Sequence, residues 1–159
     1  MSEPVNIHAT GLVLGKHGLI LRGPSGAGKS LLALELLAQF EARGDKAKLV
    51  SDDRVDIVRK GNGLVMHAPA NIAGLIELRG RGIVQRPHVV SAPLHLVIDL
   101  VDSLERMVEE EALFTELEGV QLPRAPVPRR GVIDPTHQLL LVAEALRELP
   151  VTLPRQKNA

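Results

Sequence analysis

The chain has 159 residues, 45% of them hydrophobic, and its 19 basic residues balance 19 acidic ones. This length corresponds to about one domain with a single core, and the zero net charge argues against nucleic acid or an anionic membrane as a partner. The chain has no Cys, Trp or Tyr, no signal peptide and no apolar run of membrane-spanning length, so disulfides and thiolate metal sites are excluded and a cytoplasmic protein is expected.

Two short apolar strands come first in chain order, at 11–15 and 18–23, and we expect a tight hairpin between them. A helix is predicted over 30–43, because leucines form a broad apolar face and Gly44 supplies a stop signal. Residues 47–60 then predict a strand, an acidic turn and a second strand.

Further elements are predicted in the rest of the chain. Its features are glycine-punctuated apolar runs at 63–69 and 72–84, a buried strand at 93–101, a polar helix or loop at 104–114 and an amphipathic helix at 135–149. We therefore predict an α/β fold with a mixed, partly antiparallel sheet and flanking helices. The domain is expected to span 1–150, and the polar residues 151–159 are expected to form a flexible tail.

The segment GPSGAGKS fits the phosphate-binding pattern G-x-x-x-x-G-K-[ST] between a predicted strand and a predicted helix. Its glycines let the backbone wrap around phosphates, the lysine reaches the β- and γ-phosphates, and the serine is placed to bind Mg²⁺. The predicted nucleotide-binding residues are Gly23, Pro24, Ser25, Gly26, Ala27, Gly28, Lys29 and Ser30.

Such a loop needs a further carboxylate for the metal, and the sequence offers two candidates. Asp99 ends the apolar run LHLVID, whereas Asp52 and Asp53 follow the run KLVS. The pattern alone leaves both open. On an extended chain, adjacent side chains point to opposite sides, so Asp52 and Asp53 could serve metal and substrate separately. A solvated acidic turn remains the alternative interpretation.

The segment IELRGRG at 76–82 is the other dense cluster of charges. Arg79 and Arg81 could face phosphoryl oxygens, although an exposed edge strand with alternating charge would look similar. The histidines at 8, 17, 67, 88, 95 and 137 show no metal-ligand spacing.

Together these pieces resemble the catalytic domain of the bacterial HPr kinase/phosphorylase family. The resemblance covers residues 5–149 and is carried by IHATGLVLGKHGLILRGPSGAGKS, LVSDDRVDI, LIELRGRGIV and APVPRRG, in that order. It implies a compact P-loop α/β domain of the type also found in phosphoenolpyruvate carboxykinases, with ATP and Mg²⁺ as ligands.

The resemblance also implies a role for each matching residue. Lys29 would neutralise the transferring phosphoryl group, and Ser30, Asp52 and Glu77 would supply metal ligands, which leaves Asp99 as a strand residue. Asp53 would be the general base, His8 would tune it, and Arg106 would stabilise charge near the phosphoryl group.

The reaction implied by the resemblance is phosphorylation of a serine on the small phosphocarrier protein HPr, which many members also reverse with inorganic phosphate. Members commonly form hexamers. The family's usual N-terminal domain has no counterpart before His8, so we expect the short form found in alphaproteobacteria, and residues 126–131 match the loop tied to dephosphorylation only in part. A small-molecule kinase and a non-enzymatic nucleotide sensor are the alternatives.

Overall fold

The computed structural model describes residues 3–150, so the tail expected over 151–159 lies outside the described residues. Within this range the helices are α1 (Lys29–Ala42), α2 (Pro135–Arg147) and the short 3-10 helix η1 (Glu110–Leu113). The strands are β1 (Val5–Ile7), β2 (Ala9–Leu14), β3 (His17–Arg22), β4 (Ala47–Ser51), β5 (Val55–Lys60), β6 (Gly63–His67), β7 (Leu75–Leu78), β8 (Gly82–Gln85), β9 (Ser91–Leu94), β10 (Leu96–Val101), β11 (Phe114–Leu117) and β12 (Val120–Pro128).

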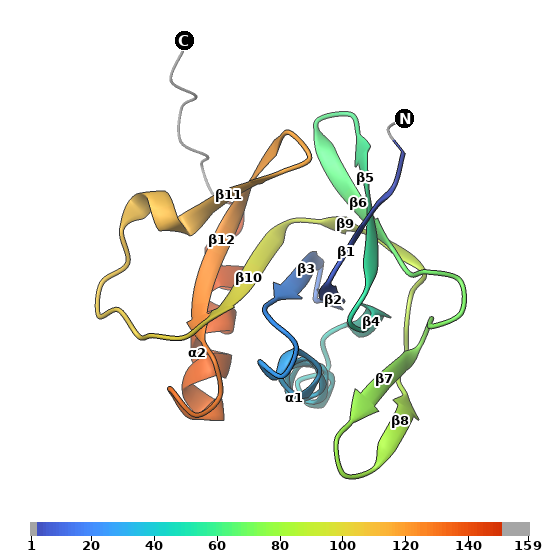
Figure 1. Cartoon of the computed structure of the whole chain (residues 1–159), viewed down its shortest axis with the longest axis horizontal. Helices are drawn as coiled ribbons and strands as arrows, with labels where there is room; N and C mark the ends of the chain where they lie inside the picture. Colours follow the sequence, from blue (N-terminus) through green and yellow to red (C-terminus); the bar gives the residue numbers. More distant parts are fainter. Residues whose placement is uncertain (1–2, 151–159) are drawn as a thin grey trace.

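A six-stranded mixed sheet, ordered β11-β12-β10-β3-β2-β4, forms the centre of the molecule (Figure 1). Strands β3, β10 and β12 run parallel to one another, and the remaining pairings are antiparallel. The three parallel strands therefore end at the same sheet edge. The P-loop, the segment 102–109 and the loop 129–134 all leave from that edge, which is where α/β proteins place their ligand sites.

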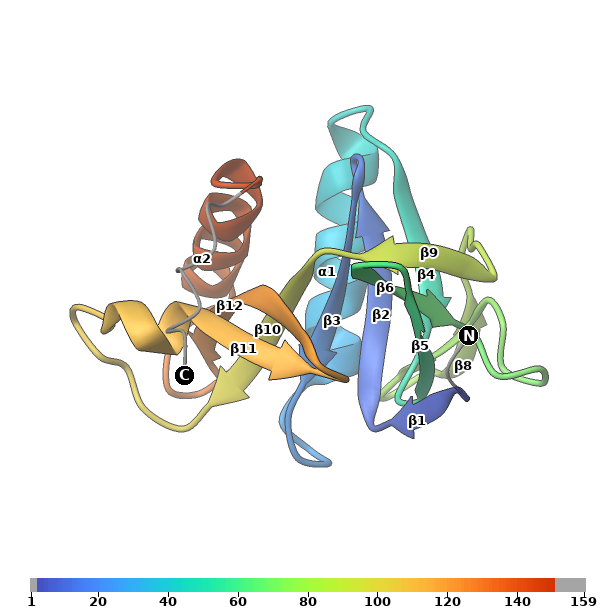
Figure 2. The same ribbon diagram turned by 90° about the horizontal axis from the view of Figure 1, so that it is seen from above.

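The central sheet is covered on both faces. Helices α1 and α2 lie side by side on one face (Figure 2), and a four-stranded sheet, β1-β5-β6-β9, packs on the other. Strand β10 illustrates the alternation that this requires: Leu96, Ile98 and Leu100 join the helix-side core, whereas Val97 joins the core between the sheets. A separate hairpin of β7 and β8 projects beside α1 (Figure 1).

The predicted mixed α/β fold is confirmed, including the hairpin before the P-loop, the helix after it and the strand, turn and strand of 47–60. The strand predicted over 93–101 is instead two strands interrupted at His95. The cause is a close crossing at Gly18, where a Cβ atom would lie 1.8 Å from the carbonyl oxygen of Pro93. His95 secures the crossing, because its Nδ1 accepts a 3.0 Å hydrogen bond from the Gly18 amide.

Strands β11 and β12 were not predicted. Strand β12 contains Pro123, Pro126 and Pro128, which lack an amide hydrogen and hide the strand signal, yet it pairs with β10 on one side and β11 on the other. The predicted polar helix or loop of 104–114 is mainly irregular and contains only η1. None of the helices within 3–150 is long and apolar enough to cross a membrane.

Candidate active site

The P-loop joins β3 to α1, and it has the backbone shape that its glycines predict. Gly26 and Gly28 have φ angles of +85° and +93°, a backbone conformation that residues other than glycine rarely adopt. Gly28 is also the N-cap of α1, which begins at Lys29, so the first amides of the helix and the positive end of its dipole face the loop.

Lys29 is the one charged residue of the P-loop, and its side chain is buried. Its ammonium donates hydrogen bonds to the carbonyl oxygens of Gly23 at 2.7 Å and Pro24 at 3.2 Å. The backbone of the loop thus holds the cation beneath the cradle, where it complements negative charge.

Asp52 connects three parts of the fold through its two carboxylate oxygens. Its Oδ1 accepts hydrogen bonds from the hydroxyls of Ser30 at 2.6 Å and Thr10 at 3.0 Å. Its Oδ2 accepts a 3.1 Å hydrogen bond from the amide of Glu77 in β7. One carboxylate therefore joins the start of α1, strand β2 and the β7–β8 hairpin.

Asp53 points to a different partner from its neighbour. Its Oδ1 lies 2.5 Å from Nε2 of His8, and its amide donates a 3.2 Å hydrogen bond to the Thr10 hydroxyl. The φ angle of Asp53 is +66°, in the left-handed region that aspartate tolerates better than most residues. The two carboxylates therefore have separate partners, although both residues contact the Thr10 hydroxyl, and the cause is this turn geometry and not the alternation of an extended strand.

These groups line one cavity of about 410 Å³. Its lining residues are Ser25, Gly26, Ala27, Gly28, Lys29, Ser30, Leu31, Asp52, Asp53, Glu77, Arg79 and Arg130. The cavity brings together residues 25–30 of the P-loop, both acids of the turn and Glu77, whereas the predicted nucleotide-binding residues Gly23 and Pro24 are not among its lining residues. His8 reaches it through Asp53.

Two arginines add positive charge to this cavity. Arg79 lies in the turn after β7, with its Nε 3.7 Å from the carboxylate of Glu77. Arg130 follows β12 and forms an ion pair with Glu35 of α1. A planar guanidinium can donate two parallel hydrogen bonds to the oxygens of a phosphoryl group, so both arginines suit a phosphate ligand.

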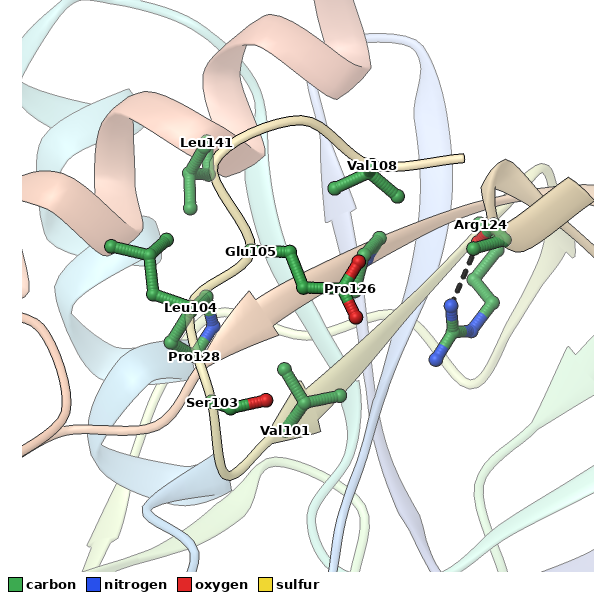
Figure 3. A pocket seen from close by; sticks show the side chains of 10 residues that line it. Val101, Ser103, Leu104, Glu105, Val108, Arg124, Pro126, Pro128 and Leu141 are labelled. Atoms are coloured by element: carbon green, nitrogen blue, oxygen red, sulfur yellow. Dashed lines mark hydrogen bonds between the residues drawn. The ribbon is translucent and has the colours of Figure 1, made fainter. Parts of the chain in front are cut away.

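Arg106 is not among the residues that line this cavity. It lies in the exposed segment 102–109, which borders a second cavity of about 330 Å³ between β10, β12 and α2 (Figure 3). That cavity is mainly apolar, and the side chain of Glu105 reaches across it over Pro126 (Figure 3). The geometry gives no support to Arg106 as a phosphoryl contact, and that role stays a prediction.

Asp99 is engaged in structural contacts on the sheet face opposite the helices. Its carboxylate binds Arg22 at 2.7 and 2.8 Å and Nε of Arg124 at 2.5 Å, across three neighbouring parallel strands. Burial raises the pKa of Asp99, but the hydrogen bonds and charges of Arg22 and Arg124 outweigh burial and hold its pKa below the ordinary value. Asp99 is thus occupied by arginines, which favours the pair Asp52 and Asp53 as the candidate carboxylates beside the P-loop.

Sequence reasoning missed three residues of the site. Thr10 fixes the acidic turn through both Asp52 and Asp53, and it lies within the quoted segment IHATG without having been singled out. Arg130 lies within the quoted segment APVPRRG, but nothing in the pattern distinguishes it from Arg129. Glu35 reads as an ordinary polar position of an amphipathic helix.

The donor set of the cavity fits Mg²⁺ bound to nucleotide. Ser30, Asp52 and Glu77 offer oxygen ligands, which Mg²⁺ prefers, and all three line the cavity together with Lys29. Among residues 3–150, no three His, Asp or Glu side chains form a metal cage. Kinase sites hold Mg²⁺ through one or two carboxylates together with substrate phosphates, so no such cage is required.

Comparison with known proteins gives a consistent result. Residues 1–145 match the family model "HPr Serine kinase C-terminal domain". The chain is 32% identical over 140 residues to HPr kinase/phosphorylase of Streptococcus thermophilus and 34% identical over 135 residues to that of Clostridium acetobutylicum. These matches cover 80% of this chain but only 43% and 42% of the relatives, so the chain spans less than half their length.

A solved structure also resembles the chain along most of its length. The Hpr(Ser) kinase/phosphatase from Coxiella burnetii superposes with a TM-score of 0.71 at 29% sequence identity. The match covers 91% of this chain and 98% of the other.

Proposed function

This chain belongs to the HPr serine kinase C-terminal domain family, and we propose that it transfers the γ-phosphoryl group of ATP to a serine hydroxyl of HPr. The observation that carries the proposal is the cavity that joins Lys29 and Ser30 of the P-loop to Asp53. The shared lining supports the proposal, because phosphoryl transfer to a hydroxyl requires a phosphate-binding group and a base in one site, and Asp53 is the carboxylate proposed as that base.

In the proposed reaction, Asp53 accepts the proton of the serine hydroxyl while the serine oxygen bonds to the γ-phosphorus. The bond between the γ-phosphorus and the bridging oxygen breaks, and ADP leaves. His8, 2.5 Å from the Asp53 carboxylate, orients this base and leaves its second oxygen for the proton. In the proposed dephosphorylation, an oxygen of inorganic phosphate bonds to the phosphorus of phosphoserine and the bond from that phosphorus to the serine oxygen breaks, so pyrophosphate forms. Protonated Asp53 gives its proton to the serine oxygen, and the attacking phosphate supplies the proton that restores Asp53.

The charged groups of the cavity stabilise the transferring phosphoryl group. Lys29 and the amides at the start of α1 supply fixed positive charge and dipoles that need no rearrangement during the reaction. Ser30, Asp52 and Glu77 would hold Mg²⁺, which when bound neutralises charge on the β- and γ-phosphates. Asp52 also holds Ser30 and the β7–β8 hairpin in place, so the ligand set is organised before nucleotide binds.

We include in this proposal HPr as the protein partner, a homo-oligomeric assembly and a cytoplasmic location. The names of the relatives support HPr as the substrate. The proposal treats 1–150 as one catalytic domain.

The decisive test is transfer of labelled γ-phosphate from ATP to purified HPr in the presence of Mg²⁺. Lys29→Ala serves as the blank, since it removes the cation of the cradle. Acid-stable phosphoserine on HPr with the native chain, and none with the variant, would support the kinase. If the native chain binds nucleotide but labels neither HPr nor a small molecule, a nucleotide sensor becomes the better interpretation.

A further inference from the structure

The ion pair between Glu35 and Arg130 has no role in the reaction described above, although it lies beside the cavity. The two residues are 95 positions apart, and Nη2 of Arg130 contacts Oε1 of Glu35. Glu35 lies one helical turn after Leu31, on the same side of α1, and Leu31 lines the cavity. The pair therefore connects the phosphate-binding helix to the loop that follows β12.

The backbone just before Arg130 is held by two hydrogen bonds. The amide of Arg129 donates a 2.9 Å hydrogen bond to Val101, and the buried side chain of Gln138 in α2 donates one of 3.0 Å to Pro128. Arg129 turns away from the cavity and binds Asp102, with 2.8 Å between Nε and Oδ1. Two consecutive arginines thus point in different directions, and only Arg130 lines the cavity.

The Glu35 contact engages one nitrogen of the Arg130 guanidinium. Arginine carries five N–H donors, and within the described chain Nε and Nη1 of Arg130 have no other hydrogen-bond partner. These donors remain available for phosphoryl oxygens. Arg130 has 40% of its side chain exposed, and a free arginine at such exposure would sample many rotamers.

The position of Glu35 is otherwise unfavourable for a nucleotide site. A carboxylate close to a polyphosphate-binding cavity repels the ligand unless its charge is used elsewhere. The ion pair with Arg130 neutralises the Glu35 carboxylate, and it limits the guanidinium of Arg130 to one side of α1. The benefit is orientation, since misplacing a catalytic group by about 1 Å can cost about a hundredfold in rate.

We propose that Glu35 is a positioning residue that holds Arg130 over the P-loop cavity, so that the remaining donors of Arg130 contact the phosphoryl group. This inference rests on the proposed function. It adds a contact from the loop after β12 to the cradle formed by Lys29 and the helix amides. Glu35 itself touches neither nucleotide nor acceptor.

A double-mutant cycle tests this coupling through the turnover number for HPr phosphorylation. We expect Arg130→Gln to lower kcat about a hundredfold and Glu35→Gln to lower it about tenfold. Glu35→Gln should have no further effect in the Arg130→Gln background, because the positioned group is already absent. Glu35→Asp, which keeps the charge, should recover part of the rate. The proposal would be overturned if the two reductions in kcat multiplied in the double variant, or if Glu35→Gln kept the native kcat.

The neighbouring ion pair supplies matched controls. Arg129→Gln and Asp102→Asn break a similar exposed contact outside the cavity, and both should retain the native kcat. Thermal unfolding of all variants separates loss of rate from loss of folded protein.

A failure of the proposed function is distinguished by the native chain itself, measured first. If the native chain transfers no phosphate to HPr, the double-mutant cycle uses nucleotide binding in place of kcat. The quantity compared between variants is then the ratio of the dissociation constants of ADP and ATP. Arg130 over the cavity should favour the nucleotide with the extra phosphate, and both Arg130→Gln and Glu35→Gln should reduce that preference. An unchanged ratio in Glu35→Gln would then overturn the positioning role.

Discussion

The carboxylate of Asp52 and the hydroxyl of Ser30 are 2.6 Å apart, so the acidic turn and the P-loop are in direct contact. The same carboxylate accepts a hydrogen bond from the backbone amide of Glu77. The proposed metal ligands are thus linked to one another within the protein. A shift of Asp52 would therefore also move Ser30 at the start of α1 and Glu77 in β7.

Asp52→Asn should weaken Mg²⁺-dependent nucleotide binding while leaving the fold intact. The amide can still accept from Ser30, but it lacks the charge for Mg²⁺ and cannot accept from both Ser30 and Glu77. We expect the affinity for ATP with Mg²⁺ to fall about ten- to a hundredfold, by analogy with other altered metal ligand shells. Calorimetric titrations with and without Mg²⁺ measure this. Equal losses in both titrations would contradict the metal role.

Asp53→Asn should lower kcat for HPr phosphorylation by about a hundred- to ten-thousandfold, because general base catalysis contributes on that order. Nucleotide affinity should stay near the native value. His8→Ala should lower kcat less, since it removes only the partner of the base. Asp56→Asn is the control: Asp56 accepts a hydrogen bond from Asn6 on the exposed side of β5, away from the cavity. Full activity in Asp53→Asn would rule out this base.

Thr10→Val should destabilise the acidic turn, although the side chains of threonine and valine have nearly the same shape. Thr10 is fully buried, and its hydroxyl donates to Asp52 and accepts from the amide of Asp53. The free energy of unfolding should drop by about 1–3 kcal/mol, because these groups lose a partner. Chemical denaturation measures the loss. Thr10→Ser keeps the hydroxyl and should retain most of the hydrogen bonding, whereas equal losses in both variants would assign the effect to packing.

Asp99→Asn should destabilise the fold by about 2 kcal/mol at neutral pH, because Arg22 and Arg124 lose their half-buried counter-ion. The arginines hold the folded-state pKa of Asp99 below its ordinary value of 3.8. This carboxylate therefore stabilises the fold fully above the unfolded pKa and loses its effect as pH falls through the folded pKa. Urea unfolding should show a deficit that is constant from pH 7 to 5 and shrinks below about pH 4.

His95 should make the native chain less stable in mild acid. Burial, followed by the charge of His17, lowers the pKa of His95 below 6.5, and Nδ1 must stay unprotonated to accept from Gly18. Its stabilising contribution is complete above the unfolded pKa of 6.5 and declines as pH falls toward the folded pKa. His95→Asn keeps an acceptor without a charge, so its stability should decline less between pH 7 and 5. Parallel declines in urea unfolding would contradict this.

Local sequence signals predicted the parts of the fold that depend on neighbours in the chain. The P-loop, the hairpin before it and helix α1 each follow from residues within one short segment. Strand β12 was hidden because its prolines act against strand formation locally, whereas pairing with β10 and β11 decides the outcome.

The site shows the same division between local and distant contacts. Lys29 and Ser30 follow from the motif alone. The choice of Asp52 over Asp99 rests on contacts between residues far apart in sequence, since Asp99 is engaged by Arg22 and Arg124. Arg130 and Glu35 meet only in the folded chain, where the loop after β12 reaches α1, so no pattern in either segment predicts the contact.

The common edge at which β3, β10 and β12 end has a consequence for how this domain can diverge. The P-loop, the segment 102–109 and the loop 129–134 leave from that edge, whereas the strands behind it carry residues of both hydrophobic cores. The segment 102–109 contributes no residue to either core. Its length and composition can therefore change without repacking either core, so this stretch can diverge between relatives while the central sheet and the P-loop keep their positions.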